Sequence, residues 1–240
     1  MVAVARVTKE TGESILESTR GSDSNNFRIL AHRGLWREKS DQNSLEAIKR
    51  AVHLGFGIET DVRDFSGTLV LSHDIPTGGE LTFSDFADFI RSHGLPLPFA
   101  LNVKSDGLAE ALSIAMDYEH KAFSNAFYFD MSVPQVLQYR KHGLPIALRN
   151  SEYESVDGLA KIFPDQTKKW VWLDSFEGEW WLETSTLGDT RYAHVVVSPE
   201  LHGRPHAEAW AAVRAAIRSG LDVYICTDFP IEFARYLNDG

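Results

Sequence analysis

From Phe27 onward, short runs of β-branched and aromatic residues alternate with stretches whose apolar residues recur at helical spacing. The short runs predict strands at Phe27–His32, Phe56–Arg63, Thr68–His73, Phe99–Lys104, Ala126–Asp130, Pro145–Arg149, Trp170–Asp174, His194–Ser198 and Asp222–Thr227. The stretches between most of them predict helices at Ser44–Leu54, Phe83–His93, Leu108–His120, Val133–His142, Ala207–Arg218 and Ile231–Leu237. Such alternation is typical of repeated strand–helix units around a parallel sheet.

The helix expected after the first strand has signals at both ends. Leu45, Ile48 and Val52 share one face, Asn43 is the expected N-cap, and Gly55 ends the helix. The run Thr68–His73 is different from the other strands, because only a short turn separates it from the strand before it. It predicts a hairpin extension of that strand.

Without the hairpin, eight strands remain, and crossover segments join them in sequence. Eight such units in roughly 210–250 residues fit a single (β/α)8 TIM barrel, here over 27–240, with 1–26 as an N-terminal tail. The alternative is an open, doubly wound sheet. That fold needs a glycine-rich phosphate loop after the first strand, and the segment Ala31–Leu35 is not one.

Composition narrows the class of protein further. The chain has 240 residues with 24 basic against 34 acidic side chains, a net charge of −10, and no basic cluster, which argues against nucleic-acid binding. The single cysteine, Cys226, excludes an internal disulfide and a cysteine-based zinc site. No apolar run approaches the roughly 20 residues of a spanning helix, and the start does not resemble a signal peptide. We therefore expect a cytoplasmic protein without an integral membrane segment.

Polar residues stand where nearly every predicted strand ends. In a barrel of this kind, the carboxyl ends of the strands form the active-site face. Apolar strands that end in ionisable groups would be costly to bury, so a functional mouth is the simpler explanation. The residues concerned are His32, Arg33, Glu59, Asp61, Arg63, His73, Asp74, Asn102, Lys104, Asp130, Arg149, Asp174, Glu200 and Asp228.

Glu59 and Asp61 are the most informative of these residues. Side chains two positions apart on a strand point to the same face, here the barrel interior. Two neighbouring carboxylates repel each other unless a cation or a shared proton relieves them, and Mg²⁺ and Ca²⁺ prefer oxygen ligands. The alternative is a pair of structural ion pairs with Arg33, Arg63 or Lys104. We favour the metal because the pair lies at a barrel mouth.

His32 and His73 are suited to proton transfer, since imidazole titrates near neutral pH. Lys104 shares a face with Asn102, and it could hold a phosphate oxygen or neutralise the carboxylates. Arg33 could do the same through two parallel hydrogen bonds.

These residues resemble the glycerophosphodiester phosphodiesterase family, within a wider group of TIM-barrel phosphodiesterases that includes phosphatidylinositol-specific phospholipase C. The similarity is specific in order and spacing over residues 29–74 and weaker as far as Lys104. The segments that carry it are Ala31–Gly34, Asn43–Ala47, Ile58–Val62 and His73–Asp74, with a faint return at Thr227–Pro230.

The resemblance implies a phosphoric diester hydrolase of lipid metabolism that acts on a small glycerophosphodiester-like molecule. His32 and His73 would be the acid–base pair, Arg33 and Lys104 would contact the phosphate, and one divalent cation would bind Glu59 and Asp61. Mg²⁺ and Ca²⁺ are the expected ions, and Mn²⁺ is a third candidate. The family usually has another carboxylate ligand two positions before the lysine. Here that position is Asn102, whose amide oxygen can still ligate the metal with one negative charge fewer.

Three other interpretations stay open. The chain could bind a phosphorylated ligand without turnover, which Asn102 motivates and the retained histidines oppose. It could be a phospholipase-type enzyme that releases a cyclic phosphate. It could also abstract a proton beside a carboxylate, which would require three metal carboxylates.

In the metal site that the resemblance implies, Asp130 could compensate as a ligand for the charge that Asn102 lacks.

The second half of the chain is expected to set specificity. The segments Ser151–Glu154, Ser175–Trp181 and Pro199–Arg204 follow predicted strands and should overhang the mouth. Trp180 and Trp181 could cover part of a substrate or pack beneath a loop.

Cys226 is expected to be a small buried side chain. The sequence does not indicate an oligomeric state.

Overall fold

The computed structural model describes residues 25–116, 120–161 and 169–239. Nine strands form one sheet: β1 (Ile29–His32), β2 (Gly57–Phe65), β3 (Thr68–Leu71), β4 (Phe99–Val103), β5 (Ala126–Phe129), β6 (Ala147–Asn150), β7 (Trp170–Leu173), β8 (Ala193–Val197) and β9 (Val223–Thr227). The helices are α2 (Leu45–His53), α3 (Phe83–His93), α4 (Ala109–Ala115), α5 (Val133–Lys141), α6 (Val156–Ala160), α7 (Ala207–Arg218) and α8 (Pro230–Asn238). Of the expected tail, 1–26, only Asn25 and Asn26 lie among the described residues.

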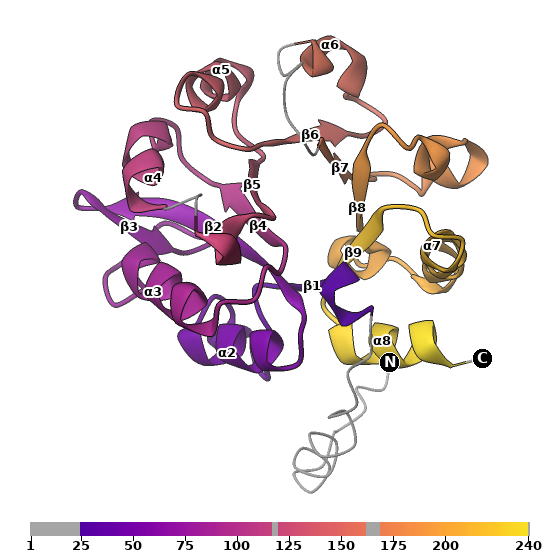
Figure 1. Ribbon diagram of the computed structural model, residues 1–240, viewed down its shortest axis with the longest axis horizontal. Coiled ribbons are helices and arrows are strands. Elements are labelled where there is room, and N and C mark those ends of the chain that lie inside the picture. Colours follow the sequence, from indigo (N-terminus) through magenta and orange to yellow (C-terminus); the bar gives the residue numbers. More distant parts are fainter. Residues whose placement is uncertain (1–24, 117–119, 162–168, 240) are drawn as a thin grey trace, which may run out of the picture.

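The sheet closes on itself as a barrel of parallel strands. Its order is β5-β4-β2-β1-β9-β8-β7-β6, and the two ends of this path meet through a parallel bridge between Tyr128 and Ile146. The helices surround the ring of strands, as Figure 1 shows. The predicted TIM barrel is therefore confirmed, and the open doubly wound alternative is excluded.

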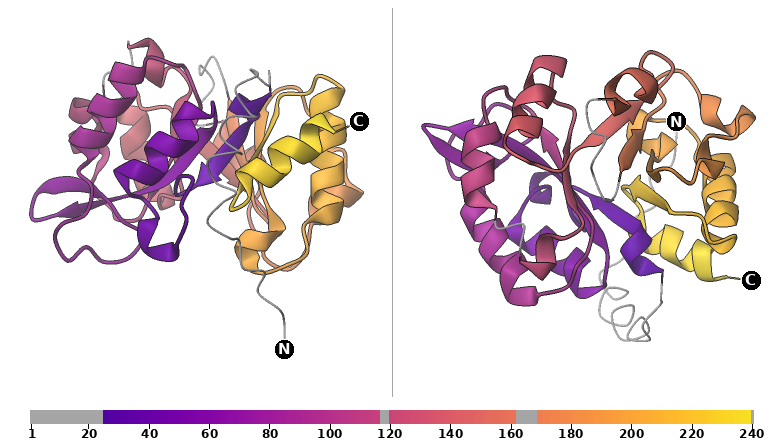
Figure 2. Two further views of the ribbon diagram at one scale, coloured as in Figure 1. Left: turned by 90° about the horizontal axis from the view of Figure 1, so that it is seen from below. Right: turned by 45° about the horizontal axis from the view of Figure 1, so that its top comes forward.

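The expected hairpin is also confirmed. β3 pairs antiparallel with the second half of β2, from Val62 opposite Leu71 to Phe65 opposite Thr68, and it pairs with no other strand of the described chain. The hairpin projects beyond the ring of helices (Figure 2). His73 follows it directly, so the hairpin determines where that histidine lies.

Two apolar layers fill the fold. The larger one lies between the strands and the helices, and includes Ile48, Phe86 and Phe233. The second fills the barrel interior with Leu30, Ala100, Phe127, Phe129, Ala147, Trp170, Trp172, Ala193, Val195, Val197, Tyr224 and Cys226. Phe129 and Trp172 stack there with ring centroids 3.9 Å apart. Trp172 is thus an interior residue, and so is Cys226, which confirms the prediction of a small buried side chain there.

Some element boundaries differ from the predicted ones. η1 (Asn26–Arg28) replaces the start of the first predicted strand, so β1 begins at Ile29. Helix α4 ends at Ala115, and part of the predicted extension to His120 lies outside the described residues. Between β7 and β8 the chain forms only the short 3-10 helices η4 (Trp180–Glu183) and η5 (Thr186–Gly188). Trp181 is buried there, which favours packing beneath the loop over contact with a substrate.

None of the helices in the described part of the chain combines the length and the apolar character that a membrane crossing needs.

Candidate active site

Four of the predicted site residues lie at the carboxyl ends of β1, β2 and β4. β1, β2 and β4 are neighbours, with His32 paired to Glu59 and Asp61 paired to Asn102 in the strand register. Because these residues continue the inward-facing positions of their strands, they lie above the aromatic layer of the interior. The parallel sheet therefore brings together four of the predicted site residues.

The turn after β1 explains why the chain needs glycine beside His32 and Arg33. Gly34 has φ +87°, and a Cβ there would lie 2.9 Å from the backbone carbon of Ala47 in α2. Only glycine combines this conformation with so close an approach. Arg33 also has a positive φ, of 59°, and its backbone N–H donates to the carbonyl of Glu59 at 2.8 Å. The turn thus fixes both side chains over the end of β2.

Glu59 is buried with few partners. It is 2% exposed, and its Oε2 accepts no hydrogen bond, while Nε2 of His32 lies 3.8 Å away. Burial, reinforced by the neighbouring charge of Asp61, raises the pKa of Glu59 to about 7. A buried carboxylate without hydrogen bonds costs free energy, so this position favours a bound proton or a cation.

Asp61 has cationic neighbours. Its Oδ2 lies 3.0 Å from Nε of Arg33, and its Oδ1 lies 3.3 Å from Nζ of Lys104. The structural ion pairs considered as an alternative to a metal are therefore present at Asp61. Arg63 takes no part, because its Nε donates to the carbonyl of His73. Oδ1 of Asp61 still accepts no hydrogen bond, because the geometry to Lys104 is that of an ion pair alone.

Asn102 presents its oxygen to the same site. A side-chain hydrogen bond joins it to Asp130, and because a carboxylate can only accept, the amide N–H of Asn102 is the donor. Its Oδ1 is buried and has no hydrogen-bond partner. Asp130 itself pairs with Nη1 of Arg149 at 3.1 Å, and burial raises its pKa. Asp130 thus has other partners than a metal.

Three buried oxygens without hydrogen-bond partners therefore belong to the three predicted metal residues: Oε2 of Glu59, Oδ1 of Asp61 and Oδ1 of Asn102. Carboxylate and amide oxygens are the donors that Mg²⁺ and Ca²⁺ take. Within the described residues, no group of three or more His, Cys, Asp and Glu side chains could hold a metal ion. The donor set fits a hard divalent cation only if the amide of Asn102 contributes.

The two predicted catalytic histidines differ in their surroundings. Nδ1 of His32 lies 2.7 Å from Oδ1 of Asp228, which follows β9. Burial lowers the pKa of His32, but the hydrogen bond with Asp228 and the charge of Glu59 outweigh it and leave the pKa raised. His73 has a side chain that is 45% exposed, and its Nδ1 lies 2.8 Å from Oδ1 of the neighbouring Asp74. His32 is therefore part of the buried cluster, whereas the side-chain contact that the structure gives for His73 is with Asp74.

Asn43 is not the helix cap that the sequence predicts. Ser44 caps α2 by accepting the backbone N–H of Ala47, so that prediction is wrong. Asn43 instead has φ +57° and turns into the site, where its Nδ2 donates to Oδ2 of Asp61 at 2.9 Å and its Oδ1 accepts from the hydroxyl of Thr60 at 2.7 Å. Both residues are capping types, and only the backbone conformation separates their roles.

Hydrogen bonds tie the three loops that follow β6, β7 and β8 to one another. The carboxylate of Glu152 accepts the backbone N–H of Phe176 at 3.0 Å. Nη2 of Arg204 donates to the carbonyl of Ser175 at 2.7 Å. In the second of these loops, Nε1 of Trp180 donates to the carbonyl of Asp174 at 3.0 Å. The position of these loops over the mouth stays a prediction.

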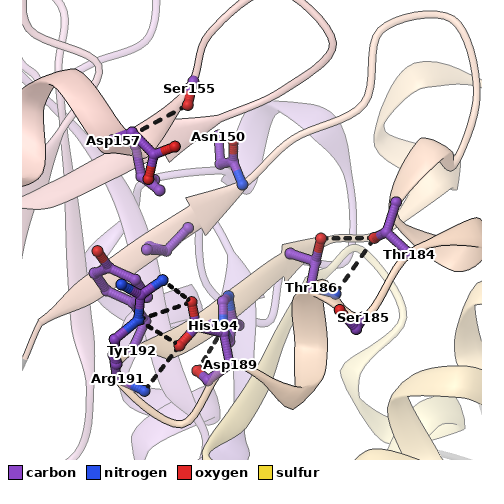
Figure 3. A pocket seen from close by; sticks show the side chains of 12 residues that line it. Asn150, Ser155, Asp157, Thr184, Ser185, Thr186, Asp189, Arg191, Tyr192 and His194 are labelled. Atoms are coloured by element: carbon purple, nitrogen blue, oxygen red, sulfur yellow. Dashed lines mark hydrogen bonds and ion pairs between the residues drawn. The ribbon is translucent and has the colours of Figure 1, made fainter.

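A separate polar cavity of about 260 Å³ lies on the flank of the barrel, and residues of the short helices α6 and η5 line part of it. Figure 3 shows its lining, which includes Thr184, Thr186, Asp189 and the outward-facing His194 of β8. The predicted catalytic, phosphate-binding and metal residues do not line it. The cavity is therefore distinct from the mouth.

No protein-family model and no curated protein matches this chain. Its fold is similar to a glycerophosphodiester phosphodiesterase of Agrobacterium tumefaciens str. C58, with 17% identity, a TM-score of 0.56, and coverage of 88% of this chain and 99% of that one. It is also similar to a Ca²⁺-dependent phosphatidylinositol-specific phospholipase C of Streptomyces antibioticus, with 12% identity, a TM-score of 0.52, and coverage of 87% and 97%. The expected resemblance is thereby confirmed at the level of the fold.

Proposed function

We propose that this protein hydrolyses a small phosphodiester at the mouth of the barrel with the help of one divalent cation. The observation that carries the proposal is that Glu59, Asp61 and Asn102, on neighbouring strands beside His32, each have a buried oxygen without a hydrogen-bond partner. The similar structures, a glycerophosphodiester phosphodiesterase and a Ca²⁺-dependent phospholipase C, support the same class of reaction.

Glu59, Asp61 and Asn102 would hold the cation through their buried oxygens that accept no hydrogen bond. When bound, a divalent cation supplies Lewis-acid stabilisation of the charge that develops on phosphate oxygens. Mg²⁺, Ca²⁺ and Mn²⁺ all accept such donors. A cation there would also relieve the repulsion between Glu59 and Asp61.

The cationic side chains of Arg33 and Lys104 bind the non-bridging oxygens of the diester. Both already flank Asp61, at 3.0 Å and 3.3 Å. Their charges offset the negative charge of the phosphate in a partly buried site, where such interactions are stronger than in water. Arg33 is further oriented by Gln42, whose Oε1 accepts from its Nη1 at 3.2 Å.

His32 and His73 transfer the protons. One imidazole removes a proton from the attacking hydroxyl, and the other protonates the alkoxide that leaves phosphorus. Asp228 occupies Nδ1 of His32, so Nε2, on the side of Glu59, is the nitrogen that reacts. The attacking group is water, or a hydroxyl of the substrate that gives a cyclic phosphate first.

A second candidate function is binding of a phosphorylated ligand without turnover. Two observations favour it: Asn102 stands where a third carboxylate would strengthen the metal site, and the side chain of His73 is 45% exposed. In that case Arg33 and Lys104 would still bind phosphate, while His32 and His73 would be dispensable.

The test of the proposed function is cleavage of bis(p-nitrophenyl) phosphate and glycerophosphocholine with Mg²⁺, Ca²⁺ or Mn²⁺. We expect activity that EDTA abolishes and that His32→Ala and His73→Ala each reduce by on the order of 10²-fold or more. Full activity in both histidine variants would refute the acid–base assignment. Tight binding of a phosphomonoester without any cleavage would support the second candidate instead.

A further inference from the structure

Glu200 is a partly buried acid beyond the end of β8 that the proposed reaction does not use. It lies in η6 (Pro199–His202), which directly follows β8, and its side chain is 9% exposed. A carboxylate at such a site needs hydrogen-bond donors around it. The structure supplies them from the ends of two strands.

Both oxygens of Glu200 accept hydrogen bonds. Oε1 accepts the hydroxyl of Thr227 and, at 3.3 Å, the backbone N–H of Asp228. Oε2 accepts the hydroxyl of Ser198, which itself accepts Nε1 of Trp210 at 2.9 Å. The side chain of Glu200 therefore connects Ser198, which follows β8, with Thr227 at the end of β9.

The bond to Asp228 connects Glu200 with the reacting histidine. The Asp228 backbone is held by Glu200, and the Asp228 carboxylate lies 2.7 Å from Nδ1 of His32. The partner of one ring nitrogen determines which tautomer a histidine adopts and which way its ring faces. A shift of the Asp228 backbone would therefore change the direction of Nε2 of His32.

We propose that Glu200 is a positioning residue, which fixes the backbone of Thr227 and Asp228 so that the Asp228 carboxylate holds His32 in its Nδ1–H form. This inference rests on the proposed function for its catalytic consequence, but not for the arrangement itself. His206, with Nδ1 3.9 Å from Oε2 of Glu200, packs on Trp210 with ring centroids 4.0 Å apart and closes the network on its outer side.

Two variants separate positioning by hydrogen bonds from an effect of charge. Glu200→Ala removes the acceptors of the Asp228 N–H and the Thr227 hydroxyl, whereas Glu200→Gln retains an acceptor oxygen without the charge. Asp189→Ala is the matched control, because Asp189 is also a loop carboxylate that accepts a backbone N–H, from Arg191 at 3.1 Å, but lies on the flank of the barrel.

The first readout is the ¹⁵N chemical shifts of the His32 imidazole in the full-length protein at one fixed pH. We expect the Nδ1–H tautomer in the wild type, in Glu200→Gln and in Asp189→Ala, and a mixture of tautomers in Glu200→Ala. Asp228→Asn provides the reference for a lost partner. An unchanged tautomer in Glu200→Ala, or an equal change in Glu200→Gln, would overturn the proposal.

The second readout is phosphodiester cleavage. Loss of a residue that orients a reacting group through another costs on the order of 10-fold to 100-fold, so we expect such a fall in kcat for Glu200→Ala with little change in KM. In the double variant with Asp228→Asn, the losses should not add, because both act through one contact. Additive losses would contradict the proposal. If no variant and no wild type cleaves a diester, the proposed function fails, and the tautomer comparison still decides the role of Glu200.

Discussion

Nδ1 of His32 lies 2.7 Å from Oδ1 of Asp228, although 196 residues separate the two in the sequence. The barrel makes this contact, because β1 and β9 are neighbours in the ring and pair in parallel. The contact occupies Nδ1 of His32, so Nε2 is the nitrogen that we propose for proton transfer.

The first prediction concerns this pair. Asp228→Asn keeps the shape of the side chain but removes the charge and presents an N–H group as well as an oxygen to Nδ1 of His32. General acid–base catalysis contributes on the order of 10²–10⁴-fold, so kcat for a phosphodiester should fall by roughly 10²-fold, with KM nearly unchanged. Steady-state kinetics measure this. A variant with the wild-type kcat would show that His32 needs no partner.

The second prediction concerns Asn43. Asn43→Ala removes the hydrogen bonds to Asp61 and Thr60 and places alanine at φ +57°. A buried polar group left without its partner costs about 1–3 kcal/mol, and the strained backbone adds about 1 kcal/mol. Urea unfolding should show a loss of about 2–4 kcal/mol in the free energy of unfolding, by those two terms.

Asn43→Gly is the control for the backbone, because glycine adopts a positive φ without strain. It should lose less stability than Asn43→Ala while weakening the metal site equally. Equal stability of all three proteins would contradict the role assigned to the Asn43 side chain.

The third prediction concerns Asn102. Asn102→Asp restores a third carboxylate beside Glu59 and Asp61. In EDTA the variant should have a lower Tm than the wild type because of the added repulsion. With Mg²⁺ or Ca²⁺ it should bind the cation more tightly, measured by calorimetric titration, because ligand charge sets the affinity of such sites. Unchanged metal affinity would place Asn102 outside the metal site.

The fourth prediction concerns the pH dependence set by Glu59. Burial raises its pKa in the folded protein to about 7. The unfolded chain releases this proton at a lower pH, so the stability contributed by Glu59 is present in acid and is lost as the pH rises towards 7. In EDTA, Tm should therefore fall between pH 5 and 8 by more in the wild type than in Glu59→Gln.

A divalent cation should reverse this trend, since it replaces the proton on Glu59. The rise in Tm on addition of Mg²⁺ or Ca²⁺ should be larger at pH 8 than at pH 6 in the wild type. In Glu59→Gln the rise should be small at both values. A cation effect independent of pH in the wild type would contradict the assignment of Glu59 as a ligand.

The barrel could be predicted from the sequence because each strand–helix unit has its own short sequence pattern, and this pattern repeats along the chain. Each strand is a short apolar run, the polar residues follow at the strand ends, and the pairing of neighbours follows from the crossover connections. Glu59 and Asp61 share a face for the same reason. The length of α4 and the 3-10 helices after β7 are harder to predict, because short helices lack a strong periodic signal.

The site could be predicted only where the strand pattern determines it. The sequence predicts Asn43 as the N-cap, because Asn and Ser at adjacent positions are both good caps and nothing in their order shows which one has the left-handed backbone. The pairing of Asp228 with His32 requires the closed ring, in which the last strand returns to the first. The ion pairs of Asp61 with Arg33 and Lys104 were considered from the sequence, but their geometry is a property of the fold alone.

We propose that a divalent cation on Glu59, Asp61 and Asn102 allows this barrel to cleave a phosphodiester. Phosphorus NMR of a set of diesters, incubated with the wild type and with Glu59→Gln in the presence of Mg²⁺ or Ca²⁺, measures this cleavage. With the wild type, we expect a diester signal to give way to a phosphomonoester or cyclic phosphate signal. With Glu59→Gln, or with EDTA, the diester signal should persist. Diester signals that persist with the wild type and every cation, or disappear equally with Glu59→Gln, would refute the proposal.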